Sequence, residues 1–259
     1  MKTIYLIHEQ QDLLWNNYGN FEEVFAEVGA PFPPKEHLEH IKSNGGEKIV
    51  LLSDDDSEIL GWIGIVPEPD KKIAELAGIE VNSNYRNKGY GKKLITEAQK
   101  WLSEKGISKF KFQTSPLFTS NSLLYVKAFQ SAYKWNNQNA LPPDNIPWPV
   151  VDCEMEWPLS KRKIKIKDIE KALERSIITW TGLHPKFDDE GLNSAKQYQT
   201  LEIPFLSLPT VFEEFRNGNF DVAKIPFSAF EWLSNNGYHF LDFQEYDERY
   251  FYVFRKNKK

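Results

Sequence analysis

The most informative segment of this chain is GIEVNSNYRNKGYGKKL, residues 78–94. Alternating apolar residues at its start predict the end of a β-strand, and the apolar spacing beyond Gly91 predicts an amphipathic helix. Between them lies a short polar loop with two glycines, Gly89 and Gly91. The free N–H groups and the dipole at the start of a helix make such a junction a site for anions. We therefore expect a phosphate group to bind here.

Residue types around this junction support the same interpretation. Both glycines are expected to let the backbone approach a phosphate closely and to adopt φ > 0, and Arg86, Lys88 and Lys92 add positive charge. Two common phosphate motifs do not fit: a P-loop needs Ser or Thr where Lys93 stands, and a dinucleotide loop needs a third glycine where Leu94 stands. A bare Gly-x-Gly would also be compatible with a tight strand-to-helix turn that binds nothing.

The complete pattern is more specific. Arg86-x-x-Gly89-x-Gly91 resembles the [Q/R]-x-x-G-x-[G/A] pyrophosphate loop of the GNAT acetyltransferases, and Val81 stands where that family ends its fourth strand. The resemblance implies acetyl-CoA as co-substrate and a bulge in the fourth strand, which separates two strands so that the pantetheine arm lies between them. It also implies that the Val81 N–H polarises the thioester carbonyl. The implied cofactor-binding residues are Ile79, Val81, Arg86, Asn87, Lys88, Gly89, Tyr90, Gly91, Lys92 and Asn121.

Direct acetyl transfer to an amine requires a base, because only roughly one lysine-like amine in 2500 is neutral at pH 7. A nearby carboxylate supplies such a base, directly or through water. Glu75, six residues before Val81, resembles the base glutamate of the family's histone acetyltransferases; a strand glutamate that faces solvent is the alternative. Glu80 is expected to face the opposite way in a strand without a bulge, which makes it the weaker candidate.

The leaving thiolate needs a proton, which many family members supply from a tyrosine on the next helix. The family pattern there resembles N-x-x-A-x-x-L-Y-x-x-x-G-F; Asn121 and Tyr133 match its first and last positions, but its tyrosine position falls on Ala128. Tyr125, three residues earlier, lies on nearly the same helical face and is our candidate acid. A core packing role for Tyr125 is the alternative.

The order of elements predicts a mixed α/β domain over residues 1–158, with an α+β mixed sheet. The resemblance implies that this domain has the GNAT acyl-CoA N-acyltransferase fold. The expected strands are 4–9, 48–53, 58–66, 73–81, 110–114 and 150–157, and the expected helices are 12–28, 35–43, 91–106 and 121–133. Residues 159–259 are expected to form a second, smaller α+β domain of unknown role. Its expected helices are 168–181, 210–216 and 227–235, followed by a hairpin of 238–246 and 249–256.

Composition limits the functional classes. The net charge of −5 does not favour binding to nucleic acid. No apolar run approaches the ~18 residues that a membrane-spanning helix needs. The N-terminal segment is not predicted to be a signal peptide. The single cysteine, Cys153, is expected to be a core thiol in a reducing compartment, so we expect a cytoplasmic protein. No third metal ligand is evident near His37 and His40, so no metal is expected.

We therefore expect an N-acetyltransferase that moves the acetyl group of acetyl-CoA directly to a primary amine of a small molecule or peptide. The alternative is a non-catalytic acetyl-CoA-binding or sensing module, which the missing tyrosine would suit. A third interpretation makes residues 159–259 a dimerisation or protein-interaction domain, and leaves a homodimer open. The sequence carries no signature of the acceptor amine.

Overall fold

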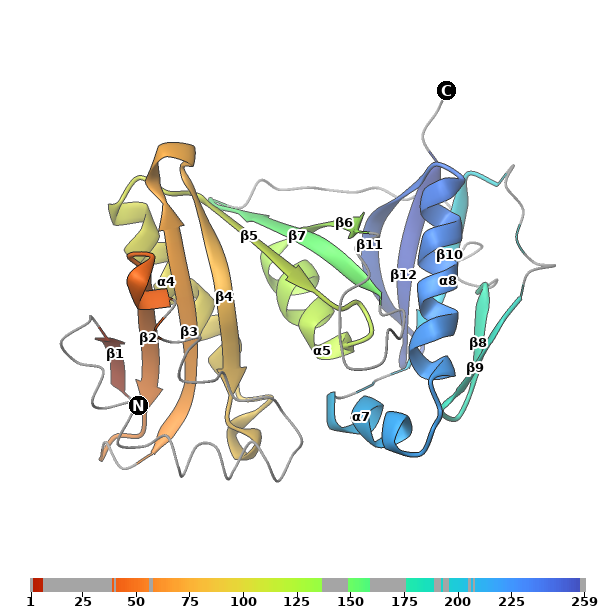
Figure 1. Cartoon of the computed structure of the whole chain (residues 1–259), viewed down its shortest axis with the longest axis horizontal. Helices are drawn as coiled ribbons and strands as arrows, with labels where there is room; N and C mark the ends of the chain where they lie inside the picture. The colour runs from red at the N-terminus through yellow and green to blue at the C-terminus, as the bar shows by residue number, and fades with distance from the viewer. Residues whose placement is uncertain are drawn as a thin grey trace. The chain divides into compact units, whose positions relative to one another are not determined.

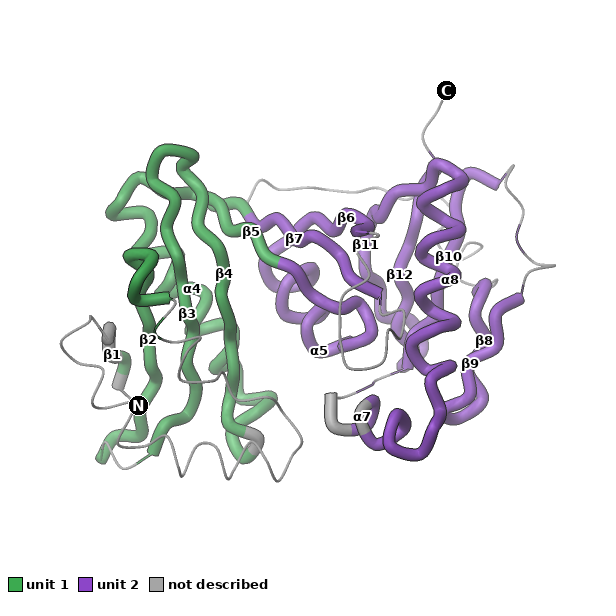
Figure 2. Tube along the Cα trace, viewed as in Figure 1, with its two compact units in different colours: residues 1–112, 156–158 green, residues 113–155, 159–259 purple. Residues whose placement is uncertain are grey.

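The computed structural model describes residues 2–6, 39, 41–55, 58–136, 149–158, 176–188, 192, 196–204, 206 and 208–256 (Figure 1). The chain divides into two compact units (Figure 2). Unit 1 comprises Met1–Phe112 and Glu156–Pro158, and unit 2 comprises Gln113–Met155 and Leu159–Lys259. Residues 113–155 thus belong to the same compact unit as the C-terminal part of the chain. The domain boundary predicted from the sequence instead follows residue 158.

Unit 1 is built on a mixed β-sheet. Its strands β1 to β4 pair in chain order, each antiparallel to the next, and β5 then pairs parallel to β4. The strands are β1 (Lys2–Leu6), β2 (Glu47–Leu52), β3 (Ile59–Glu68), β4 (Ile73–Val81) and β5 (Lys109–Thr114), with the short turns η2 (Pro69–Lys71) and η3 (Ser83–Tyr85) on either side of β4. This mixed architecture confirms the expected fold class.

Helix α4 (Tyr90–Glu104) packs against β2, β3 and β4 (Figure 1). Its buried residues, Leu94, Ile95, Ala98 and Leu102, recur at helical spacing and form one apolar face. Burying a leucine or isoleucine side chain stabilises a fold by roughly 1.5–3 kcal/mol, so this face anchors the helix firmly. The helix ends before Gly106, whose φ of 73° is left-handed.

Unit 2 contains three groups of strands and most of the remaining helices. Strands β6 (Ala132–Asn136) and β7 (Val150–Glu156) pair antiparallel, β8 (Ile178–Thr181) and β9 (His184–Phe187) form a hairpin, and β10 (Tyr198–Ile203), β12 (Arg249–Lys256) and β11 (Tyr238–Tyr246) form a sheet in that order. Only the last residue of β7 belongs to unit 1. The helices are α5 (Thr119–Ser122), the π-helix η4 (Leu123–Ala128), α7 (Leu208–Arg216) and α8 (Asp221–Asn235).

An aromatic core joins residues 113–136 to the C-terminal sheet within unit 2. The hydroxyl of Tyr252, on β12, donates to the carbonyl of Pro116 at 2.7 Å and is hydrogen-bonded to Ser122 on α5. Trp135, on β6, stacks on Phe230 of α8 with ring centroids 5.4 Å apart. The segment beyond residue 159 therefore buries side chains in a packed core together with residues 113–136.

Most of the elements expected from the sequence are confirmed. Strands β4, β11 and β12 have the expected bounds, and Cys153 is buried on β7, where desolvation raises the pKa of its thiol well above its usual range. The helix expected over 12–28 lies outside the described residues, and so does 159–175. In the helix expected over 35–43, residues 39 and 41–43 are described and are helical.

Two expected helices were wrong in part. The helix expected over 121–133 ends near Phe129, because Gln130 takes a left-handed φ of 53° and residues 132–136 form β6. Within the helix expected over 168–181, the described residues are extended: Ser176 makes a β-bridge, and Ile178–Thr181 is β8. Branched side chains such as Ile178 and Thr179 favour the strand there.

Candidate cofactor and acceptor site

The polar loop after β4 is ordered by Asn82. Its backbone N–H donates to the Leu60 carbonyl at 3.0 Å, its side-chain oxygen accepts from the Asn84 N–H at 3.1 Å, and its carbonyl accepts from the Tyr85 N–H at 2.8 Å. Asn82 is itself buried. These bonds end the strand and turn the chain toward the start of α4.

The three basic side chains of the loop differ in their surroundings. Arg86 is half-buried, and its Nε donates to the Val81 carbonyl at 3.2 Å, so the guanidinium is held at the end of β4. Lys88 is exposed; its Nζ donates to the Asn84 carbonyl at 3.3 Å and lies 4.9 Å from the centroid of the Tyr85 ring. Lys92 is exposed on the first turn of α4. Positive charge therefore surrounds the start of the helix.

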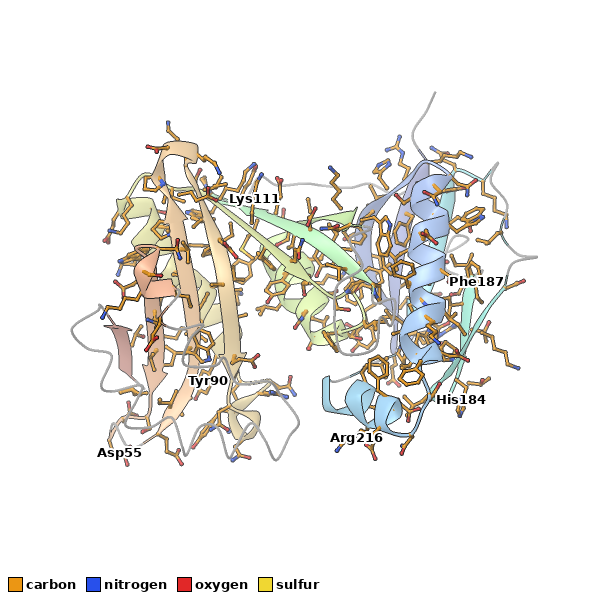
Figure 3. The ribbon with its side chains drawn as sticks, in the orientation of Figure 1. Asp55, Tyr90, Lys111, His184, Phe187 and Arg216 are labelled. Carbon is orange, nitrogen blue, oxygen red and sulfur yellow. The ribbon has the colours of Figure 1, made fainter. Side chains whose placement is uncertain are left out.

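The two glycines of the loop have different roles. Gly89 is the N-cap of α4 with a φ of 82°, and Asn87 is also left-handed with a φ of 61°. Gly91, however, lies in the first turn of α4 and is not among the residues with positive φ, so the expectation of φ > 0 was wrong for Gly91. It follows Tyr90, the first residue of α4, which is labelled in Figure 3. Because Gly89 has no side chain to act as a cap, the first N–H groups of α4 remain suited to an anion.

Strand β4 has an open edge beside this loop. In the described residues, β4 pairs with β5 only through Ala74–Phe110 and Glu75–Lys111. The Asn82 N–H points toward β3, and backbone N–H groups alternate in direction along a strand, so the N–H groups of Ile79 and Val81 point away from β3. An extended ligand could therefore pair with this edge.

A bulge in β4 rearranges the carboxylates expected from the sequence. Gly78 pairs with Gly64, but Leu76 pairs with Ile65, so Ala77 is an extra residue on β4. This confirms the bulge that the family resemblance implies. Glu75 is opposite Val66 and Glu80 is opposite Trp62, four residues apart on β3, so both glutamates extend from the same face of the sheet. The expectation that Glu80 faces the opposite way was wrong, because it assumed a strand without a bulge.

Trp62 occupies this face of the sheet. A β-carbon at Gly78 would lie 2.9 Å from its Cη2 and 3.5 Å from its Cζ2, and one at Gly64 would lie 3.0 Å from its Cζ3. The indole therefore lies over the Gly64–Gly78 pair. Its Cζ2–Cη2 edge, which is on the same side of the ring system as Nε1, lies over β4. On the opposite face, a β-carbon at Gly61 would lie 3.2 Å from Leu94 of α4, so the helix covers the other side.

The two glutamates differ in their exposure and charge. Glu80 is half-buried, and desolvation raises its pKa to about 7, against the opposing effect of the Arg86 charge. Glu75 is exposed. On the same face, Lys48 is opposite Gly64 and only 1% exposed, and burial lowers the pKa of its ammonium group. A carboxyl group with a pKa near the operating pH suits general-base chemistry.

The remaining candidates belong to unit 2. The side-chain amide of Asn121 donates to the Thr114 hydroxyl at 3.1 Å. Tyr125 is 5% exposed within the π-helix η4, and its carbonyl accepts from the Ser131 N–H at 3.0 Å. Single π-helical turns often occur at functional sites.

The sequence predicted the loop and strand β4 as parts of the site but gave no prediction for Trp62. Within unit 1, Ile79, Val81 and residues 86–92 lie at the open end of β4 and in the loop that follows it. Glu75 lies near the other end of the strand, where β4 pairs with β5. The available signal for Trp62 was the pair of glycines inside strands, Gly64 and Gly78, because a glycine in a strand often marks a bulge or a close approach of another group. His37 and His40 lie outside the described residues.

Comparison with known proteins identifies the fold. Residues 11–125 match the model of the Acetyltransferase (GNAT) family. This match defines the class of the domain as an acetyltransferase. The chain carries an acetyltransferase domain of the GNAT family, whose members bind acetyl-CoA. No curated protein is similar enough to this chain to count as a match.

Several solved structures resemble the chain at low identity. The ribosomal-protein-S18-alanine N-acetyltransferase from Escherichia coli is 13% identical, with a TM-score of 0.47, and the match covers 64% of this chain and 98% of that one. A GNAT-family acetyltransferase from Staphylococcus aureus Mu50 is 20% identical, with a TM-score of 0.43 over 60% and 98% of the two chains. A Bacillus subtilis acetyltransferase in complex with CoA is 16% identical, with a TM-score of 0.40 over 48% and 84%.

Among the described residues, no helix is both long enough and apolar enough to cross a membrane.

Proposed function

We propose that this protein is an N-acetyltransferase that moves the acetyl group of acetyl-CoA directly to a primary amine of a small molecule or peptide, in a ternary complex. The observation that carries the proposal is the junction of the open β4 edge with the glycine loop at the start of α4. Few ligands other than an extended chain that ends in a pyrophosphate would use both features at once.

The residues present fit such a cofactor. The pyrophosphate would be held by the backbone N–H groups of residues 86–92 and by the charges of Arg86, Lys88 and Lys92. Ile79 and Val81 would pair with the pantetheine arm through the outward-pointing N–H groups of β4, and Asn121 would contribute a further polar contact. Hydrogen bonding of the thioester carbonyl to the Val81 N–H would favour attack by an amine.

Two proton transfers accompany this reaction. A carboxylate on the exposed face of β4 would accept a proton from the acceptor ammonium, and the family resemblance assigns this role to Glu75. Tyr125 is the proposed donor to the leaving thiolate, because the family's tyrosine position holds Ala128.

A non-catalytic acetyl-CoA-binding or sensing module is the second candidate. The observation that favours it is the burial of Tyr125 together with the absence of a tyrosine at residue 128. Such a module would retain the loop and the open edge of β4, and would release no thiol in the presence of amines.

Three further proposals follow from the sequence. We propose the cytoplasm as the compartment, residues 159–259 as a second domain that borders the acceptor site, and a homodimer as one assembly state. Light scattering of the full chain tests the dimer: a mass of twice 30.2 kDa supports it, and a mass of 30.2 kDa contradicts it.

A thiol-release assay tests the central proposal. The full chain is incubated with acetyl-CoA and, in separate reactions, with spermine, L-lysine, an aminoglycoside and a hexapeptide with a free N-terminal alanine. Amine-dependent release of CoA thiol supports the transferase. Binding of acetyl-CoA without release across a broader amine library supports the sensing module instead.

A further inference from the structure

We propose that Glu80, and not Glu75, is the general base of the transfer, and that the indole N–H of Trp62 is the hydrogen-bond donor that positions the ionised Glu80 carboxylate. This inference rests on the proposed function. It departs from the role that the family resemblance gives to Glu75, and it assigns a role to Trp62, which the sequence did not single out.

The first argument is distance along β4. The proposed acetyl carbonyl lies at the Val81 N–H, and Glu80 is the neighbouring residue. Glu75 lies five strand positions away once the extra residue Ala77 is discounted, which is roughly 17 Å at about 3.3 Å per residue. Along the strand, Glu80 is therefore the nearer of the two carboxylates to the proposed acetyl group.

The second argument is the unpaired donor beside Glu80. Trp62 is 1% exposed, and its Nε1 has no hydrogen-bond partner in the described part of the chain. An unsatisfied buried N–H costs roughly 1–3 kcal/mol, so such a group usually serves a ligand or a second state. Trp62 and Glu80 are directly opposite on neighbouring strands, with β-carbons about 4.5–5.5 Å apart in such pairs. A change of the Glu80 rotamer therefore brings its carboxylate to the indole.

The third argument is electrostatic. Desolvation raises the pKa of Glu80 to about 7, so the carboxylate form is available near neutral pH and remains basic enough to accept a proton. The strand register places Lys48 on β2, Glu75 on β4 and Lys111 on β5 on this face. Arg86 follows β4, and the charge of Lys42 acts on Lys48. Among them, the positive charge of Arg86 lowers the pKa of Glu80 and so favours the carboxylate.

The Glu80 carboxylate takes one proton from the acceptor ammonium and becomes a carboxylic acid. The neutral amine then attacks the thioester carbonyl; a C–N bond forms, the C–S bond breaks, and the second proton of the amine nitrogen leaves with the thiolate as CoA thiol. Glu80 finally returns its proton to solvent, so that the reaction releases one proton in total.

Kinetics of matched variants test the assignment, with the best amine of the thiol-release panel as acceptor. We expect Glu80→Gln to lower kcat roughly 10²–10⁴-fold with acetyl-CoA affinity unchanged, and to lower it by more than Glu75→Gln does. Trp62→Phe keeps the aromatic ring but removes the donor, so its pH–rate profile should move to higher pH. If Trp62 only supported the fold, Trp62→Phe would lower the rate at every pH without moving the pH–rate profile.

Nuclear magnetic resonance provides a readout without an acceptor. In protein labelled at the glutamate carboxyl carbon, the resonance that disappears in Glu80→Gln should titrate near pH 7, and the Trp62 indole proton should shift with the same midpoint. Titration of the Glu80 carboxyl near pH 4.5, or full activity of Glu80→Gln, would overturn the assignment of the base to Glu80 but not the proposed function. A wild type that turns over no amine would overturn the proposed function and this inference with it.

Discussion

Glu75 and Glu80 extend from the same face of β4 although five positions separate them in the sequence, because Ala77 is an extra residue between them. In a regular strand, an odd separation places two side chains on opposite faces. The bulge thus places the exposed Glu75 carboxylate and the half-buried Glu80 carboxylate on one face, which also carries Trp62.

The raised pKa of Glu80 has a consequence for stability. Its pKa is about 7 in the folded protein and ordinary in the unfolded chain, so unfolding releases a proton between about pH 4.5 and 7. Raising the pH through this window therefore destabilises the wild type. We expect Glu80→Gln to gain stability relative to wild type by about 1–3 kcal/mol between pH 5 and pH 8, as measured by urea unfolding.

Glu75→Gln is the matched control for that measurement, because Glu75 is exposed on the same strand. It should follow the wild type at both pH values. An equal pH dependence of stability in Glu80→Gln and wild type would show that Glu80 is solvated in the folded protein.

Variants of Gly91 test cofactor binding and helix stability separately. Because Gly91 has a helical backbone, Gly91→Ala should leave the free energy of unfolding unchanged or raise it by up to about 1 kcal/mol. The added side chains of Gly91→Ala and Gly91→Val should nevertheless weaken CoA binding, by at least roughly tenfold for valine, about 1.4 kcal/mol. Calorimetric titration checks this, with Thr96→Val on an exposed position of α4 as the control. Unchanged affinity in a folded Gly91→Val protein would remove the loop from the site.

Gly89 is expected to behave differently, because its φ of 82° disfavours any side chain. Gly89→Val should lose both stability and CoA affinity, so it is the less informative variant of the pair.

Tyr252 joins two parts of unit 2. Tyr252→Phe leaves the buried Pro116 carbonyl and Ser122 hydroxyl without this partner, so we expect a loss of about 1–3 kcal/mol in the free energy of unfolding. Tyr246→Phe, at a tyrosine that is 49% exposed, should stay within about 0.5 kcal/mol of wild type. Equal stability of the two variants would contradict the role of this contact.

Truncation after Pro158 tests where the units divide. Residues 113–136 pack against α8 and β12, so a 1–158 fragment exposes Trp135 and the Tyr252-facing side of α5. We expect this fragment to aggregate or to lose near-ultraviolet circular dichroism. A soluble fragment that binds CoA as tightly as the full chain would instead support the boundary predicted from the sequence.

Local patterns predicted much of unit 1. The alternation in β4, the spacing of apolar residues in α4 and the loop between them are local signals, and the structure has all three. The orientation of Glu80 could not be predicted, because it depends on which residue of β4 is left unpaired by β3. Trp62 was missed for a similar reason, since its position beside Glu80 depends on strand register. The early end of the helix near Phe129 depends on tertiary contacts that favour β6.

The most direct test of the site is a titration of CoA into ¹⁵N-labelled protein. The amide resonances of Tyr90, Gly91 and Lys92 should shift together with those of Ile79 and Val81, because one ligand would contact both the start of α4 and the open edge of β4. Saturable shifts confined to these two segments and their neighbours are the expected result. Tight CoA binding that leaves both segments unshifted, or the absence of CoA binding to the folded chain, would contradict the proposed site.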